Sequence, residues 1–197
     1  MNDQRKIAVF DFDGTLTTHD TLLLFIRYAV GIKVFLWVFF LHVPLILLML
    51  LKIYPNWRVK QSIFSKCFKG MPYHRFEQLG KDFANVVNRV KRSETIATLV
   101  QLRNAGICVY VISASIEEWV KPFCMRIGVR DVLCTKVEVD ACGYLTGRFL
   151  SKNCYGQEKV NRLLHVEPER TNYYLMAYGD SRGDKELLDF ADEGHLV

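Results

Sequence analysis

The stretch at residues 7–15, IAVFDFDGT, limits the fold of this chain more than any other. Its first four residues are apolar and predict a buried strand. Two carboxylates, Asp11 and Asp13, follow that strand directly and stand before a glycine. Strands that end in this way place acidic side chains at the carboxyl edge of a sheet, where open α/β folds bind ligands. Because clustered carboxylates are unfavourable without a cation, the stretch predicts a metal at this edge.

The remainder of the chain alternates between strand and helix patterns. Short apolar runs at 107–113 and 172–177 are typical of buried strands, and helical patterns follow at 117–127 and 184–191. Such alternation predicts an α/β fold with a doubly wound parallel sheet. We further expect a β-hairpin formed by VLCTKVEVD and YLTGRFL, a helix at 156–165, helix boundaries at Pro55 and Pro72, and a last strand that begins at EGHLV.

The most apolar region, residues 21–54, follows the first carboxylates. Its run from 34 to 51 has eighteen residues interrupted only by His42 and Pro44, which is borderline for a transmembrane helix. A single crossing would separate Asp11 from every candidate residue after 107 by a bilayer. We therefore expect the segment to return to the side it came from. A hairpin bent near Pro44, an interfacial helix and a pair of apolar helices packed in a cap all remain open.

The positive charge of the chain is concentrated in one segment. The net charge is +5, but residues 52–92 alone hold ten Lys or Arg against two acidic residues. This segment could face an anionic membrane, a phosphorylated substrate or nucleic acid, or it could be a solvated surface. We expect no nucleic acid partner. Whether residues 21–54 touch a membrane or pack within the protein stays open.

The cysteines and the N-terminus indicate a reducing compartment. Six cysteines show no CxxC pair and no zinc-finger spacing with histidine, so we expect free thiols. The first residues, MNDQRK, lead directly into a strand and do not form a secretory signal. We expect a cytoplasmic protein, located at the inner face of the membrane if the apolar segment binds lipid.

Polar residues with catalytic potential stand at several predicted strand ends. Ser113 ends ICVYVIS, Asp180 and Asp184 follow NYYLMAYG, and Lys159 lies just after Gly156. A single DxD pair is a weak signal, because surface pairs of this kind are common. Together with the serine, the lysine and the GDxxxD pattern, it predicts one shared site at the carboxyl edge of the sheet.

These motifs closely resemble those of the haloacid dehalogenase-like phosphatases, in the branch that includes phosphoserine phosphatase. The matching segments are DFDGT, VISAS, GQEK and GDSRGD, in the same order. The resemblance implies a Rossmann-like core formed by residues 1–16 and 85–197. It also implies a helical cap, residues 17–84, inserted after the first strand.

A finer resemblance concerns the segment before the lysine. YLTGRFLSKNCYGQEK is similar to the corresponding segment of phosphatidylglycerophosphatase C, whose subgroup also has an apolar stretch soon after its first motif. The resemblance therefore implies a phosphorylated lipid as substrate.

The resemblance implies a role for each motif residue. Asp11 is the expected nucleophile, which forms an aspartyl-phosphate, and Asp13 the expected general acid and base. Magnesium is the expected cofactor, bound by Asp11, the Asp13 backbone carbonyl and Asp180. The remaining expected roles are phosphate binding by Ser113, the Ala114 backbone N–H and Lys159, and support of the site by Asp184, Thr15 and Gly179.

Three functions stay in competition. The first is hydrolysis of a lipid phosphate such as phosphatidylglycerophosphate, which the apolar and basic cap favours. The second is hydrolysis of a soluble phosphomonoester such as phosphoserine. The third is a membrane-associated binding protein without turnover, against which the complete set of acidic residues argues.

Overall fold

A five-stranded parallel sheet forms the centre of the molecule in the computed structural model, which describes residues 4–197. Strand β1 (Arg5–Phe10) lies in the middle and pairs with β2 (Cys108–Ile116) and β6 (Tyr173–Gly179). Strand β3 (Asp131–Thr135) extends the sheet beyond β2, and β7 (Glu193–Leu196) extends it beyond β6. The predicted α/β fold with a parallel sheet is confirmed.

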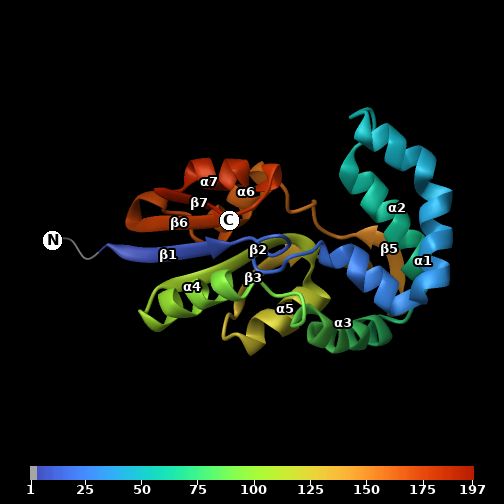
Figure 1. Cartoon of the computed structure of the whole chain (residues 1–197), viewed down its shortest axis with the longest axis horizontal. Coiled ribbons are helices and arrows are strands. Elements are labelled where there is room, and N and C mark those ends of the chain that lie inside the picture. The colour runs from blue at the N-terminus through green and yellow to red at the C-terminus, as the bar shows by residue number, and fades with distance from the viewer. Residues whose placement is uncertain (1–3) are drawn as a thin grey trace.

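Helices cover both faces of this sheet (Figure 1). Helices α4 (Ser93–Asn104) and α5 (Glu117–Arg126) lie on one side, and α6 (Gln157–Val166) and α7 (Lys185–Phe190) lie on the other. Alternate residues of β1 therefore enter different cores: Ala8 and Phe10 pack with the first pair of helices, whereas Ile7 and Val9 pack with the second. Because both faces are covered, the strand is apolar throughout, as its sequence predicts.

The cap consists of three helices beside the sheet (Figure 1): α1 (Thr21–Leu50), α2 (Asn56–Phe68) and α3 (Tyr73–Val87). Aromatic rings join it to the core, since Phe25 stacks on Trp119 of α5 with 4.3 Å between ring centroids. The residues before α2 and α3 are Pro55 and Pro72, as predicted. Proline suits these positions because it cannot continue a helix toward its own N-terminal side.

The predicted hairpin is shorter than its sequence pattern indicated. The segment VLCT belongs to β3 and pairs in parallel with β2 in the main sheet, so assigning it to the hairpin was wrong. The hairpin itself contains only β4 (Val137–Val139) and β5 (Leu145–Phe149). It packs on the cap, where the ring of Phe149 lies 5.3 Å from that of Phe64. Buried Cys134 explains the difference, because an apolar segment of this length suits a covered parallel strand.

The backbone of helix α1 is interrupted at Gly31, and Pro44 lies within the second half of the helix. Gly31 has φ 78° and ψ 163°, outside the helical range, whereas Pro44 lies inside the helix. The hairpin bent near Pro44 is one of the predicted alternatives, and the interruption in the helix backbone lies thirteen residues earlier, at Gly31. Glycine accepts a positive φ without the steric penalty of a Cβ atom.

The two halves of α1 lie in different environments. Before Gly31, Leu22, Phe25 and Ile26 are buried against the core. After it, Trp37 is 59% exposed and Phe40 69% exposed. The helix is long and apolar enough to cross a membrane by length and composition, and only 11% of its most apolar eighteen-residue window is buried. The chain then returns along α2, which packs against α1.

Candidate active site

The predicted site residues meet at the carboxyl edge of the parallel sheet. Asp11 follows β1, and its backbone N–H donates to the carbonyl of Tyr178 in β6 at 2.9 Å. Ser113 lies in β2, and Asp180 follows β6. The loops after these strands, together with the first turn of α6, enclose a cleft of about 340 Å³.

Lys159 is the buried centre of the site. Its side chain is only 3% exposed, and its Nζ donates to Asp11 Oδ1 at 2.5 Å and to Asp184 Oδ1. Burial by itself would lower the pKa of this ammonium, but the adjacent charges of Asp11 and Asp184 outweigh it and raise the pKa. Lys159 therefore stays protonated at every physiological pH.

Asp11 is held by that lysine in a site that otherwise disfavours its charge. Burial raises the pKa of Asp11 to about 7, against the opposing attraction of Lys159 and with a further contribution from Asp184. An acid with this pKa gains strongly from any additional cation nearby. The carboxylate is therefore well placed to share a positive partner besides Lys159.

Asp13 is oriented by the start of the cap. Its Oδ1 accepts hydrogen bonds from Thr21 N at 2.9 Å and from Thr21 Oγ1 at 2.6 Å, and its Oδ2 accepts one from Ser115 Oγ. The indole of Trp119 donates to Thr21 Oγ1 at 3.0 Å. Burial and the charge of Asp20 raise the pKa of Asp13. Our sequence reasoning gave no role to Thr21 or Ser115, although Ser115 lies within the VISAS motif.

Asp180 and Asp184 complete an acidic cluster with Asp11. One carboxylate oxygen from each of the three lies within 4.8 Å of the other two. Thr15 Oγ1 donates to Asp180 at 3.3 Å, and Asp184 accepts from the backbone N–H and the hydroxyl of Ser181. Burial, with the charge of Asp184, also raises the pKa of Asp180. Three acids around one lysine leave excess negative charge, so the donor set fits a hard divalent cation.

Two glycines make room for these carboxylates. Gly14 has φ +81°, and a Cβ atom there would lie 2.0 Å from Asp180 Oδ2. A Cβ on Gly179 would lie 2.5 Å from the Cβ of Asp184. Any larger residue at either position would displace an acid of the cluster, which explains the glycine in DGT and the one in GDSRGD.

The serine motif VISAS contains the two positions that are predicted to bind phosphate, Ser113 and Ala114. The hydroxyl of Ser113 is buried and accepts a hydrogen bond from the backbone N–H of Ser115 at 3.0 Å, so it supports the loop after β2. Ala114 itself lines the cleft. Ala114 therefore lines the same cleft as Asp11 and Lys159.

The cleft also contains residues that sequence reasoning did not select: His19, Asp20, Lys60 and Tyr155. Lys60 comes from α2 of the cap, and its Nζ lies 3.5 Å from Asp20 Oδ2. The only sequence signal for Lys60 was the excess of positive charge in residues 52–92. The cap therefore contributes both Lys60 and its partner Asp20 to the lining of the cleft.

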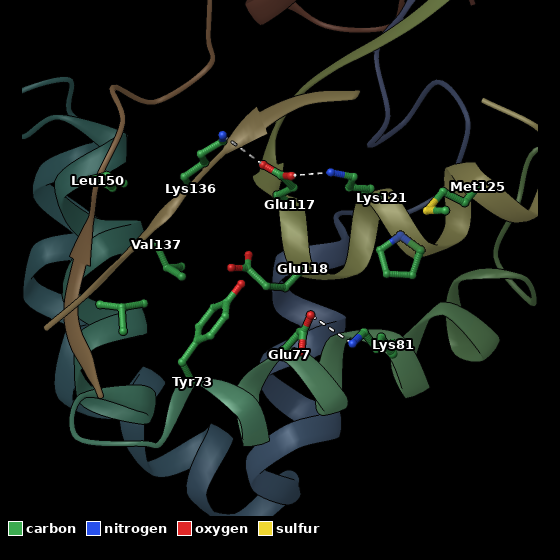
Figure 2. A pocket seen from close by; sticks show the side chains of 12 residues that line it. Tyr73, Glu77, Lys81, Glu117, Glu118, Lys121, Met125, Lys136, Val137 and Leu150 are labelled. Atoms are coloured by element: carbon green, nitrogen blue, oxygen red, sulfur yellow. Dashed lines mark hydrogen bonds and ion pairs between the residues drawn. The ribbon is translucent and has the colours of Figure 1, made fainter. Parts of the chain in front are cut away.

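A larger cavity, of about 520 Å³, lies away from these residues between α3, α5 and β4 (Figure 2). Glu118 and Tyr73 point toward one another inside it, and burial raises the pKa of Glu118 to about 7. Its other charged residues are paired, as in the Glu77–Lys81 bridge at 2.9 Å. None of the predicted catalytic residues lines this cavity.

Comparison with known proteins places this arrangement in a family. The family described as haloacid dehalogenase-like hydrolase matches residues 8–189. The protein CicA of Caulobacter vibrioides is 28% identical over 195 residues, which cover 98% of this chain and 86% of CicA.

Two solved structures show the same fold. A protein of unknown function from Bordetella pertussis Tohama I has a TM-score of 0.81 at 17% identity, and the match covers 94% of this chain and 86% of that one. A phosphoserine phosphatase, solved as a phospho-aspartyl intermediate analogue, has a TM-score of 0.61 at 22% identity. That match covers 96% of this chain and 84% of the phosphatase.

Proposed function

Because this chain belongs to the haloacid dehalogenase-like hydrolase family, we propose that it is a magnesium-dependent phosphomonoester hydrolase with Asp11 as nucleophile. The observation that carries the proposal is the contact between buried Lys159 and Asp11 at 2.5 Å, beside Asp180 and Asp184. A carboxylate fixed by a lysine at the floor of a cleft is positioned for attack on a phosphorus atom.

In the first step, one carboxylate oxygen of Asp11 attacks phosphorus in line with the ester oxygen. The P–O bond to the alcohol breaks, and Asp13 donates its proton to the leaving oxygen. The raised pKa of Asp13 favours the protonated form that this step requires. Thr21 and Ser115 hold its carboxyl group in one orientation while the proton moves.

In the second step, water attacks the aspartyl-phosphate. Asp13, now ionised, removes a proton from this water, and the bond between phosphorus and the Asp11 oxygen breaks. Inorganic phosphate leaves, and both acids return to their starting states. Lys159 keeps its charge throughout and stabilises the negative charge of the phosphoryl group.

The remaining motif residues bind phosphate or the cation. The Ala114 backbone N–H and the Ser113 hydroxyl are assigned to phosphate oxygens, and Asp184, Thr15 and Gly179 to the support of Lys159 and Asp180. Asp11, Asp180 and the Asp13 backbone carbonyl would hold Mg²⁺, which when bound neutralises phosphate charge and acts as a Lewis acid. The excess of acids over lysine in the cluster supports this assignment.

We assign the cap to residues 17–84 and substrate choice to that cap. A lipid phosphate such as phosphatidylglycerophosphate is our first candidate substrate. Support comes from α1, whose first residue, Thr21, bonds Asp13 while its second half is apolar and exposed. A phosphorylated lipid in a membrane would reach a cleft whose cap rests on the bilayer surface.

A soluble phosphomonoester such as phosphoserine is the second candidate, and one observation favours it. Lys60 and Asp20 face each other across 3.5 Å in the cleft, so they offer a cation and an anion to a zwitterionic leaving group. A binding protein without turnover is the least supported, since the acids and Lys159 form a complete catalytic set.

We also propose that the protein works in the cytoplasm, at the inner face of the membrane. Its six cysteines are free, and three of them, Cys124, Cys134 and Cys154, are buried. Free thiols suit a reducing compartment.

The test is a comparison of phosphate release from phosphatidylglycerophosphate in detergent micelles and from phosphoserine in solution, each with magnesium or with EDTA. We expect magnesium-dependent turnover of the lipid and slower turnover of phosphoserine. Rapid turnover of phosphoserine with no turnover of the lipid would favour the soluble phosphomonoester as substrate. Full activity in EDTA would contradict the role of magnesium. Asp11→Asn is the control for the nucleophile.

A further inference from the structure

A broad groove lies on the cap, away from the catalytic cleft. Its volume is about 1060 Å³, and it is bordered by α1, α2 and the hairpin strand β5. The residues that line it include His42 of α1, Trp57, Arg58 and Lys66 of α2, Lys69 after that helix, and Arg148 of β5. None of the acids of the active site is among them.

The charged residues that line this groove are all basic. Its lining contains four cations and no Asp or Glu. In the described residues 4–197, Arg58, Lys66 and Lys69 make no ion pair within 4.0 Å, whereas Arg148 Nε lies 4.0 Å from Oε2 of Glu138 in the hairpin strand β4. The hydroxyl of Ser65 adds a polar group between the cations, whereas that of Thr146 donates to Glu138 and that of Ser62 is bonded to His42. Unpaired cations with hydroxyls form a surface complementary to phosphate groups.

The groove and the catalytic cleft lie on opposite faces of α2. Arg58, Ser62, Ser65 and Lys69 recur every three or four residues, so they share one face of the helix. Lys60 lies on the other face and lines the catalytic cleft. One helix therefore carries two cationic surfaces, and a ligand in the groove does not occupy the position of the scissile phosphate.

The neighbour of the groove is the exposed apolar part of α1. His42 connects the groove to this helix, since it is a buried residue of α1 that lines the groove and bonds Ser62 Oγ through Nε2 at 3.0 Å. Large apolar side chains of α1 and the following turn remain exposed, including Leu47, Leu50 and Leu51, and Trp57 at the groove is also exposed. Apolar side chains beside tryptophan and lysine suit a membrane interface and do not suit a nucleic acid.

We propose that this groove binds the phosphate groups of anionic phospholipid headgroups while the exposed face of α1 enters the same bilayer. The occupant is a bilayer that contains anionic lipid, and charge complementarity selects it. The inference deepens the proposed function, because it assigns the surface that holds the enzyme at its lipid substrate. Binding at the groove itself requires neither Asp11 nor catalysis.

The test is sedimentation of the full chain with vesicles of phosphatidylcholine, with and without phosphatidylglycerol, at low and high salt. We expect binding to the anionic vesicles that weakens as salt rises. The variant Lys66→Gln/Lys69→Gln should lower the vesicle affinity about 25-fold, since each cation near an anionic surface contributes about fivefold. Both side chains are exposed, so the variant should fold, which circular dichroism can verify.

The matched control is Lys60→Gln, on the opposite face of the same helix. It should leave vesicle binding within about twofold of the wild type, because Lys60 lies in the cleft. Conversely, Lys66→Gln/Lys69→Gln should leave magnesium-dependent hydrolysis of the soluble ester p-nitrophenyl phosphate unchanged. Equal loss of vesicle binding in both variants would overturn the assignment to the groove.

Competition distinguishes the sources of phosphate. Inorganic phosphate or a single-stranded oligonucleotide should displace the protein from vesicles only weakly, because neither occupies the apolar face of α1. Binding to the oligonucleotide that depends on Lys66 and Lys69, with none to vesicles, would overturn the proposal. If vesicle binding depends on these lysines but lipid phosphate is not hydrolysed, the proposed docking surface is supported and the proposed lipid substrate is contradicted.

Discussion

The catalytic edge of the core and the outer surface of the cap use positive charge in opposite ways. In the core, a single buried lysine, Lys159, is bonded to two acids. On the cap, Lys66, Lys69 and Arg58 are exposed and have no acidic partner within 4.0 Å among the described residues. A buried, paired charge has one position and one set of partners, whereas exposed charges can adapt to many anions. On the proposed function, the core determines the reaction, and the cap determines where and on which substrate it occurs.

Removal of the nucleophile should cause the largest loss of activity. Asp11→Asn keeps the shape of the side chain but cannot form an aspartyl-phosphate, so phosphate release should fall at least about 10³-fold on every substrate. Vesicle binding should not change, because the groove lies on the cap. A variant that kept wild-type, magnesium-dependent activity would refute the assignment of Asp11.

Removal of the buried lysine should affect both activity and stability. Lys159→Met preserves the length of the side chain but leaves Asp11 and Asp184 facing each other without a cation. We expect loss of activity together with about 3–5 kcal/mol of destabilisation in urea, measured without metal. Lys66→Met on the exposed face is the control and should change stability by less than about 0.5 kcal/mol. Equal stabilities of the two variants would contradict the buried triad.

Replacement of Asp13 tests its role as the proton donor. Asp13→Asn should lower turnover of an alkyl phosphate by about 10²–10⁴-fold. The rate of the first step should fall less for p-nitrophenyl phosphate, because its leaving group needs no proton. A rapid burst of p-nitrophenol that equals the enzyme concentration, followed by slow turnover, is the expected result. An identical loss on both esters, without a burst, would argue that Asp13 only positions other groups.

The pKa of Asp11 predicts how stability depends on pH in EDTA. Burial raises this pKa from 3.8 to about 7, so the folded state binds the proton more tightly than the unfolded state. The contribution of protonated Asp11 to the free energy of unfolding is present below about pH 4 and is lost as pH rises toward 7. Lys159 contributes no slope in this range, since its pKa lies above it. The wild type should therefore lose about 1–3 kcal/mol more than Asp11→Asn between these limits.

Urea titrations of both proteins across this range provide the measurement. Glu118, which also has a pKa of about 7, is present in both proteins and cancels in the difference. Parallel profiles would contradict the raised pKa of Asp11. Magnesium should stabilise the wild type more as the pH rises, because the ionised carboxylate is its ligand.

Local sequence patterns predicted the core well and the cap only in outline. The strand at β1, its two acids and the glycine are consecutive, so one short window shows the strand and its edge. The contacts that orient Asp13 come from Thr21, eight residues away, and from Ser115, 102 residues away, and no pattern around Asp13 indicates either contact. Lys60 likewise reaches the cleft only through the packing of α2.

The errors of sequence reasoning also have physical reasons. The segment VLCT could pair with either neighbour, and burial of Cys134 in the main sheet decided for β2. The interruption of α1 lies at Gly31, because this glycine adopts a positive φ that a residue with a Cβ atom would disfavour. Neither outcome can be read from apolar periodicity alone.

The most direct test of the central claim is to trap the covalent intermediate. The enzyme would be mixed with substrate and magnesium, quenched in acid and digested with trypsin, and the peptide of residues 7–27 analysed by fragmentation mass spectrometry. We predict one added phosphoryl group on Asp11 in the wild type and none in Asp11→Asn. Phosphate release by the wild type with the phosphoryl group on another residue, or on none, would contradict the account.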